Sequence, residues 1–146
     1  MKVKVLTANL LWFLYSAVRT RIWRRARKNV EVVQAKILLQ LLLKNAKTIF
    51  GQEHSFETID SVAAFQRAVP VQYYEDVKPY IEKIAAGTLG VLTADSVQRF
   101  GVSSGSTSAS KLVPYTRSLV AEFQRGIDPW MCHLMRDHPQ ILRGKA

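Results

Sequence analysis

The sequence predicts an α/β chain that is mostly helical and contains one small β hairpin. Three observations lead to this fold class: long stretches with apolar residues at helical spacing, short segments rich in β-branched and aromatic residues, and one serine-rich loop between two such segments. The chain has 146 residues and is 48% apolar, which is enough for a buried core. Helices are expected first, then the hairpin, then a final helix.

The N-terminus is expected to form a basic, apolar helix region over residues 1–33. A nearly apolar run over residues 5–18 is shorter than the roughly 20 residues that span a bilayer as a helix. The basic block RTRIWRRARK follows it at residues 19–28, and such a block opposes export by a signal peptide. Two roles stay open for this helix: packing on the core of the protein, or contact with a membrane surface.

The segment from Gln34 to Phe50 predicts a helix that is buried on most of its circumference, because its polar residues form one narrow stripe. Gly51 is expected to end this helix. A short second helix is expected after Ser61, and it must end before Pro70 because the residue before a proline avoids the helical region.

A third helix is predicted in YEDVKPYIEKIAAG, residues 74–87. Asp76 caps its start, Pro79 fits only in its first turn, and Gly87 ends it. The tyrosines of this region are expected to pack the helix: Tyr73, Tyr74 and Tyr80.

Three short strands and one more helix complete the predicted elements. The strands are LGVLT, VQRFGV and KLVPY. Thr116 is a candidate cap for the final helix, in which Gly126 and Pro129 predict a kink or a break.

The net charge of +10 belongs to one end of the chain, since residues 1–28 carry eight Lys and Arg and no acidic residue. This distribution indicates contact with an anionic partner such as a membrane surface. A solvated positive face and a helix packed on the protein body stay open as alternatives. Nucleic acid is not predicted as a partner, because no sheet with basic and aromatic residues and no recognition helix accompanies the block.

Cysteine and histidine indicate neither a disulfide nor a metal site. Cys132 is the single cysteine, so it is expected to be a buried structural residue in a reducing, cytoplasmic setting. The three histidines are scattered at poor spacing for a joint metal site.

The serine-rich loop SSGSTSASK, residues 103–111, offers hydroxyls, backbone N–H groups free of bulky side chains and the ammonium group of Lys111. Such a set suits phosphate, and Gly105 would let the backbone approach the ligand closely. The segment departs from the Walker A loop at two fixed positions. From composition alone, a phosphate site and a solvated turn are equally open.

The order SSGSTSASK, followed by LVPYT, resembles the first phosphate-binding motif of adenylate-forming enzymes, usually [ST]-S-G-[ST]-T-G-x-P-K. It is most similar to the auxin-responsive-promoter family, the acyl-acid amido synthetases. The resemblance extends over roughly residues 34–143. It implies that Lys111 is the motif's lysine and that the preceding residues wrap the phosphates of ATP: Ser103, Ser104, Gly105, Ser106, Thr107 and Ser108. Ser108 stands where most members have glycine, and Ser110 where many have proline.

The resemblance implies a two-step ligase reaction with ATP and Mg²⁺. A small carboxylic acid attacks the α-phosphorus of ATP to form an acyl-adenylate and pyrophosphate, and an amine or amino acid then displaces AMP. No catalytic acid or base is assigned. Members of this family are several times longer, so residues 34–146 are expected to be an incomplete N-terminal domain that is inactive alone. The alternative function is a noncatalytic module that binds a membrane surface or another anionic partner through the basic helix, with peripheral membrane association.

Overall fold

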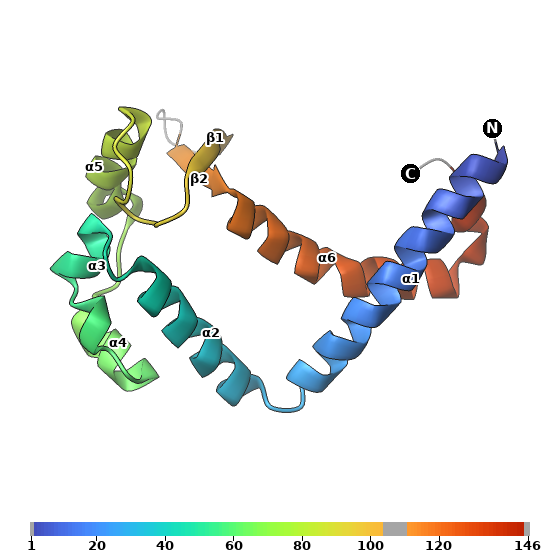
Figure 1. Ribbon diagram of the computed structural model, residues 1–146, viewed down its shortest axis with the longest axis horizontal. Helices are drawn as coiled ribbons and strands as arrows, with labels where there is room; N and C mark the ends of the chain where they lie inside the picture. The colour runs from blue at the N-terminus through green and yellow to red at the C-terminus, as the bar shows by residue number, and fades with distance from the viewer. Residues whose placement is uncertain (1, 104–110, 145–146) are drawn as a thin grey trace. The chain divides into compact units, whose positions relative to one another are not determined.

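The computed structural model describes residues 2–103 and 111–144. Its α-helices are α1 (Lys2–Ala26), α2 (Val30–Asn45), α3 (Ile49–Glu53), α4 (Val62–Ala68), α5 (Tyr74–Ala85) and α6 (Arg117–Asp137). Short 3-10 helices follow at η1 (Phe56–Thr58) and η2 (Pro139–Arg143), and strands β1 (Val97–Ser103) and β2 (Lys111–Thr116) pair antiparallel (Figure 1). The prediction of a helix-rich chain with one small hairpin is therefore confirmed.

The chain divides into two compact units. One unit contains Met1–Val30 and Ala121–Ala146, and the other contains Glu31–Val120. The division falls in the first turns of α6. None of the described helices is long and apolar enough to cross a bilayer.

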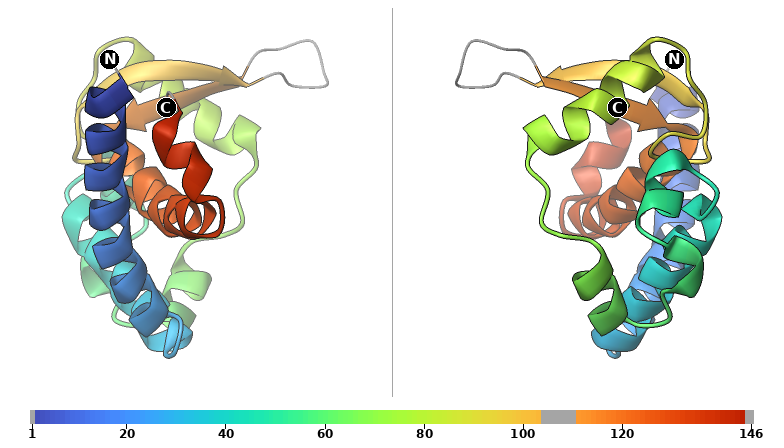
Figure 2. Two further views of the ribbon diagram at one scale, coloured as in Figure 1. Left: turned by 90° about the vertical axis from the view of Figure 1, so that its right-hand side faces the viewer. Right: turned by 90° about the vertical axis from the view of Figure 1, so that its left-hand side faces the viewer.

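In the first unit, α1 lies beside η2 (Figure 2). The Asn9 side-chain amide donates hydrogen bonds of 3.0 Å to the carbonyls of Leu142 and Gly144. Farther along α1, Arg19 Nε lies 2.6 Å from Asp128 Oδ2 of α6. Polar contacts therefore join α1 to both C-terminal elements of its unit.

The core of the second unit is a cluster of buried apolar residues: Leu42, Ala46, Phe56 and Ile59. Partly buried side chains of α2, α3 and α4 pack against this cluster. The predicted burial of α2 on most of its circumference is wrong for this chain. Leu42 is 3% exposed, whereas Val32 is 70% and Leu43 77% exposed, so only one face of α2 reaches the core.

The helix predicted over residues 34–50 divides into α2 and α3. The Thr48 hydroxyl accepts a 3.0 Å hydrogen bond from the Gly51 N–H and thereby caps a new helix after α2 has ended at Asn45. The prediction that Gly51 ends a helix is wrong, because Gly51 lies inside α3.

The helix predicted after Ser61 is confirmed as α4, and Asp76 caps the start of α5 as predicted, from the third helical position after the N-cap residue Tyr73. Ser61 Oγ accepts a 3.2 Å hydrogen bond from the N–H of Ala64, and Asp76 Oδ2 accepts one of 2.8 Å from the N–H of Tyr73. Gly87 follows the end of α5 with a φ of +94°, as a glycine at this position allows.

Pro79 lies beyond the first turn of α5, where it was not expected. Proline has no N–H to donate to the carbonyl of Glu75, but both residues are exposed, so water can donate to that carbonyl instead. The restriction of Pro79 to the first turn is therefore wrong.

Two of the three predicted strands are confirmed as β1 and β2, but residues 89–93 form no strand. The carbonyls of Gly90 and Val91 instead accept hydrogen bonds of 2.8 and 3.0 Å from the N–H groups of Ile49 and Phe50. This segment therefore satisfies the N-terminus of α3, and Val91 is 1% exposed.

Thr116 caps α6 as predicted, since its hydroxyl accepts a 3.1 Å hydrogen bond from the N–H of Leu119. Of the kink or break predicted at Gly126 and Pro129, the break does not occur, because α6 continues through both residues. Pro129 is buried, so packing in the first unit supports the helix where its sequence would weaken it.

Candidate functional site

The hairpin brings the two ends of the serine-rich loop together. Ser103 pairs with Lys111 in the strand register, so the first and last residues of the predicted motif lie opposite each other. Ser103 is exposed and Lys111 is half-buried. The other predicted phosphate ligands lie outside the described residues: Ser104, Gly105, Ser106, Thr107 and Ser108.

Tyr74 of α5 supports the start of β2. Its hydroxyl accepts a 2.9 Å hydrogen bond from the N–H of Leu112, and the Lys111 ammonium lies 5.2 Å from the centre of its ring. We call Ser103, Lys111 and Tyr74 the hairpin mouth. The sequence gives no sign of this support, because Tyr74 and Leu112 are 38 residues apart.

The other tyrosines of α5 differ from each other. Tyr80 packs edge-on against Phe50, with ring centres 5.3 Å apart, as expected for a structural residue. Its hydroxyl also donates to the Glu53 carboxylate, and this hydrogen bond is the main cause that raises the pKa of Tyr80. Tyr73 is 77% exposed, so its expected packing role is wrong.

Gly101 makes room for an aromatic ring on the hairpin. A Cβ atom at Gly101 would lie 2.6 Å from Tyr115 Cε2, so the ring covers the position where a side chain would stand. The Arg99 guanidinium lies 5.4 Å from the centre of the same ring. The Tyr115 ring of β2 thus packs against Gly101 and Arg99 of β1.

A polar cluster holds the entry to β1. Lys44 Nζ of α2 lies 2.5 Å from Asp95 Oδ2, and the Ser118 hydroxyl donates to the same carboxylate oxygen. Ser118 Oγ also lies 3.2 Å from the Thr116 hydroxyl. The hydrogen bond from Lys44 is the main cause that lowers the pKa of Asp95, and the hydrogen bond from Ser118 is the second.

The lowered pKa of Asp95 predicts a loss of stability in acid. The hydrogen bonds to the Asp95 carboxylate stabilise the folded state fully above the unfolded-state pKa near 4. This stabilisation is lost as the pH falls through the lower folded-state pKa. Lys44→Met removes the main cause, so we expect it to cost about 0.5–1 kcal/mol at neutral pH and nothing in strong acid. Urea unfolding from neutral to strongly acidic pH measures this difference, with Lys36→Met on the same helix as the control. Parallel curves for Lys44→Met and the unmodified chain would contradict the assignment.

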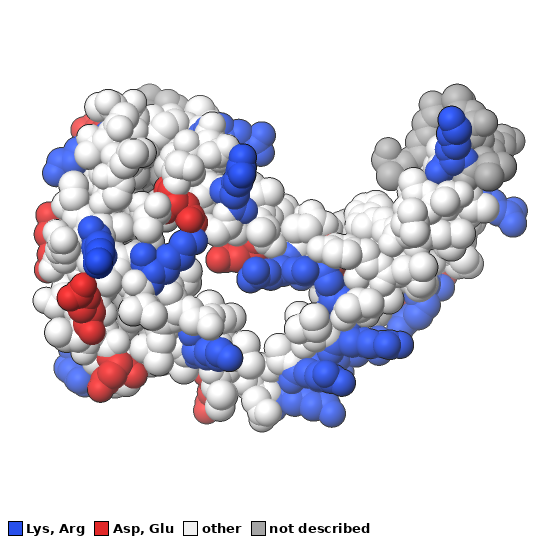
Figure 3. Space-filling model, in the orientation of Figure 1, with Lys and Arg blue, Asp and Glu red and all other residues white. Residues whose placement is uncertain are grey.

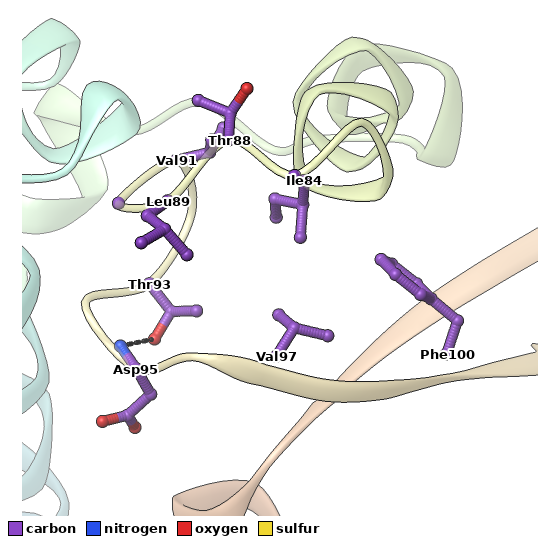
Figure 4. Close-up of a pocket in the computed structure, with 10 residues that line it drawn as sticks. Ile84, Thr88, Leu89, Val91, Thr93, Asp95, Val97 and Phe100 are labelled. Atoms are coloured by element: carbon purple, nitrogen blue, oxygen red, sulfur yellow. Dashed lines mark hydrogen bonds between the residues drawn. The ribbon is translucent and has the colours of Figure 1, made fainter.

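A small cavity of about 140 Å³ lies between the end of α5 and β1. Figure 4 shows Ile84, Val97 and Phe100 pointing toward its centre, whereas the Asp95 carboxylate points away. Pockets that hold drug-sized ligands have volumes of roughly 300–1,000 Å³, so this cavity is too small for a nucleotide or an aromatic acid.

No group of three or more histidine, cysteine or acidic side chains able to hold a metal ion occurs in the described parts of the chain. Cys132 is free and buried, as predicted. Within the described ranges, the predicted phosphate motif is represented by its two end residues, Ser103 and Lys111, which lie in the hairpin mouth.

Comparison with known proteins identifies relatives among plant amido synthetases. The chain is 36% identical over 88 residues to the indole-3-acetic acid-amido synthetase GH3.8 of Oryza sativa subsp. indica, a match that covers 59% of this chain and 14% of the relative. It is 32% identical over 89 residues to the 4-substituted benzoates-glutamate ligase GH3.12 of Arabidopsis thaliana, covering 60% and 15%. It is 26% identical over 121 residues to the jasmonoyl–L-amino acid synthetase JAR4 of Nicotiana attenuata, covering 82% and 21%.

The chain therefore spans about a seventh to a fifth of the length of these relatives. The predicted similarity to acyl-acid amido synthetases is confirmed by these matches. The model of the GH3 family N-terminal domain matches residues 19–146, which is most of the chain. This protein thus belongs to the GH3 family, through the N-terminal domain of that family.

Proposed function

We propose that this chain provides the N-terminal part of an ATP-dependent acyl-acid amido synthetase, in which residues 103–111 contact the phosphates of ATP. The substrates are ATP, a small carboxylic acid and an amino acid. The activities in the names of the relatives support the reaction class, since each name describes an amido synthetase, a ligase or an amino acid synthetase. The hairpin mouth is the structural observation that supports the site.

The chemistry of the hairpin mouth fits a phosphate group. A lysine ammonium and a serine hydroxyl both donate hydrogen bonds to phosphate oxygens, and the ammonium also neutralises charge. Neither β1 nor β2 contains an acidic residue that would repel an anion. Mg²⁺ is proposed as the ion that accompanies ATP.

Tyr74 positions Lys111 for this role. The ring lies below the ammonium, and the hydroxyl holds the next backbone N–H, so both interactions place the start of β2 on α5. Lys111 contributes charge and hydrogen bonds to the phosphates and transfers no proton. ATP supplies the adenylyl group that activates the carboxylate: the carboxylate oxygen bonds to the α-phosphorus, pyrophosphate leaves, and the amine then displaces AMP from the acyl carbon.

Titration of the ¹⁵N-labelled chain with ATP and Mg²⁺, followed by NMR, tests the phosphate contact. We expect the amide signals of Ser103 and Lys111 to shift, and Lys111→Ala to weaken binding roughly tenfold or more, as for a lost charge-assisted hydrogen bond. Lys36→Ala on α2 removes the same charge elsewhere and serves as the control. Equal ATP affinity in Lys111→Ala and Lys36→Ala would overturn the assignment.

Pyrophosphate exchange tests the reaction. Because the chain spans only 14–21% of the relatives' length, we expect it to bind ATP without exchange when indole-3-acetic acid, jasmonic acid or benzoates are supplied. Exchange by the chain alone would show that these residues complete an adenylation site.

A further inference from the structure

Helix α1 buries polar side chains and exposes apolar ones. Asn9, Ser16 and Thr20 are 5%, 0% and 3% exposed. On the opposite side, the apolar side chains are 41–64% exposed: Leu10, Leu11, Leu14, Val18 and Ile22. A helix on the surface of a globular protein normally has the reverse arrangement.

Spacings of three and four residues place these apolar side chains on one side of the helix, together with Arg21 and Arg25. We call this set of seven the outer face of α1: Leu10, Leu11, Leu14, Val18, Arg21, Ile22 and Arg25. Lys and Arg side chains line the C-terminal half of α1 (Figure 3). The outer face is thus apolar toward one end and cationic toward the other.

The buried polar side of α1 makes the contacts with its own unit, which leaves the outer face available for a partner. The Asn9 amide donates to the carbonyls of Leu142 in η2 and of Gly144 just after it, and Arg19 is paired with the buried Asp128. These contacts hold the polar side of α1 against its own unit. The helix can therefore meet a partner through its outer face without refolding.

The charge of the N-terminus indicates the kind of partner. The first 28 residues contain eight Lys and Arg and no Asp or Glu. A second copy of this helix would bring positive charge against positive charge. An anionic bilayer instead offers acyl chains to the leucines and negative headgroups to the arginines.

We propose that the outer face of α1 docks the chain on an anionic phospholipid bilayer, with the helix lying along the surface. The apolar side chains enter the boundary between headgroups and acyl chains, and the stems of Arg21 and Arg25 extend toward the headgroups. The family match begins at Arg19, so most of the apolar part of this face precedes the region shared with the family. Membrane docking is thus separate from the proposed synthetase function.

Co-sedimentation of the 146-residue chain with phosphatidylcholine vesicles, with and without phosphatidylserine, tests this proposal. We expect binding that requires phosphatidylserine and weakens at high salt. Arg21→Ser with Arg25→Ser should weaken binding roughly thirtyfold, as expected for two lost surface cations. The control pair Lys36→Ser and Arg67→Ser removes the same charge from α2 and α4 and should leave binding unchanged.

A second pair of variants tests the apolar contact. Leu14→Glu with Val18→Glu should abolish vesicle binding, whereas Leu43→Glu with Leu89→Glu, at positions 77% and 80% exposed in the other unit, should not. All four positions are exposed, so circular dichroism should show an unchanged fold. Vesicle binding that persists in the Leu14 and Val18 variant would overturn the proposal. So would a dimer in sedimentation equilibrium that this variant dissociates, because the occupant would then be a second copy.

Discussion

Replacing Arg19 with methionine is expected to destabilise the first unit by about 3–5 kcal/mol. Asp128 is 0% exposed, and its carboxylate is held by Arg19 at 2.6 Å and by the Gln124 amide at 2.9 Å. Removal of the guanidinium leaves a buried carboxylate without its counter-charge, and one neutral hydrogen bond cannot replace it. The contact also joins α1 to α6, so its loss affects the packing of both helices.

Tryptophan fluorescence in urea reports this change selectively. The three tryptophans, Trp12, Trp23 and Trp130, all belong to the first unit. We expect a lower transition midpoint for Arg19→Met and a partial recovery when Asp128→Leu is added, because no buried charge is then left. Arg136→Met breaks an exposed ion pair with Asp137 and should cause no measurable change. A loss in Arg19→Met as small as that in Arg136→Met would mean that Asp128 does not depend on Arg19.

Local signals in the sequence predicted the starts of three helices correctly: α4, α5 and α6. Ser61, Asp76 and Thr116 each bond to a residue three positions away, so the whole interaction lies within one short stretch of sequence. The ends of the serine-rich loop were placed together for a similar reason, because two adjacent strands joined by a short loop form a hairpin.

Interactions between distant residues were not predictable in this way. Residues 89–93 have the composition of a strand, but their carbonyls serve the N-terminus of α3, some 40 residues earlier in the chain. Tyr74 is an ordinary tyrosine in the sequence and becomes part of the hairpin mouth only when α5 lies beside β2. The inverted arrangement of α1 also requires the structure, since the sequence does not show which side of the helix is covered.

Gly51→Ala is expected to destabilise the second unit by about 2 kcal/mol, within the range for overpacking of a tight contact. A Cβ atom at Gly51 would lie 2.1 Å from the carbonyl oxygen of Asn45 and 3.0 Å from that of Ala46. These are backbone atoms at the end of α2, so the clash cannot be relieved by rotating a side chain. Alanine also favours the helix by up to about 1 kcal/mol, and the clash must exceed this gain.

Gly126→Ala is the matched control, because a Cβ atom at Gly126 would meet nothing within 4 Å. Both glycines lie inside α-helices, so the propensity gain is the same and only the surroundings differ. Urea unfolding followed by circular dichroism should show opposite signs: stabilisation by Gly126→Ala and destabilisation by Gly51→Ala. Hydrogen exchange should also increase at Ile49 and Phe50, whose N–H groups bond to the segment at Gly90 and Val91. If both variants were stabilised, the Asn45 carbonyl oxygen could not lie within 2.1 Å of the Cβ position at Gly51, and the close approach of α3 to the end of α2 would be wrong.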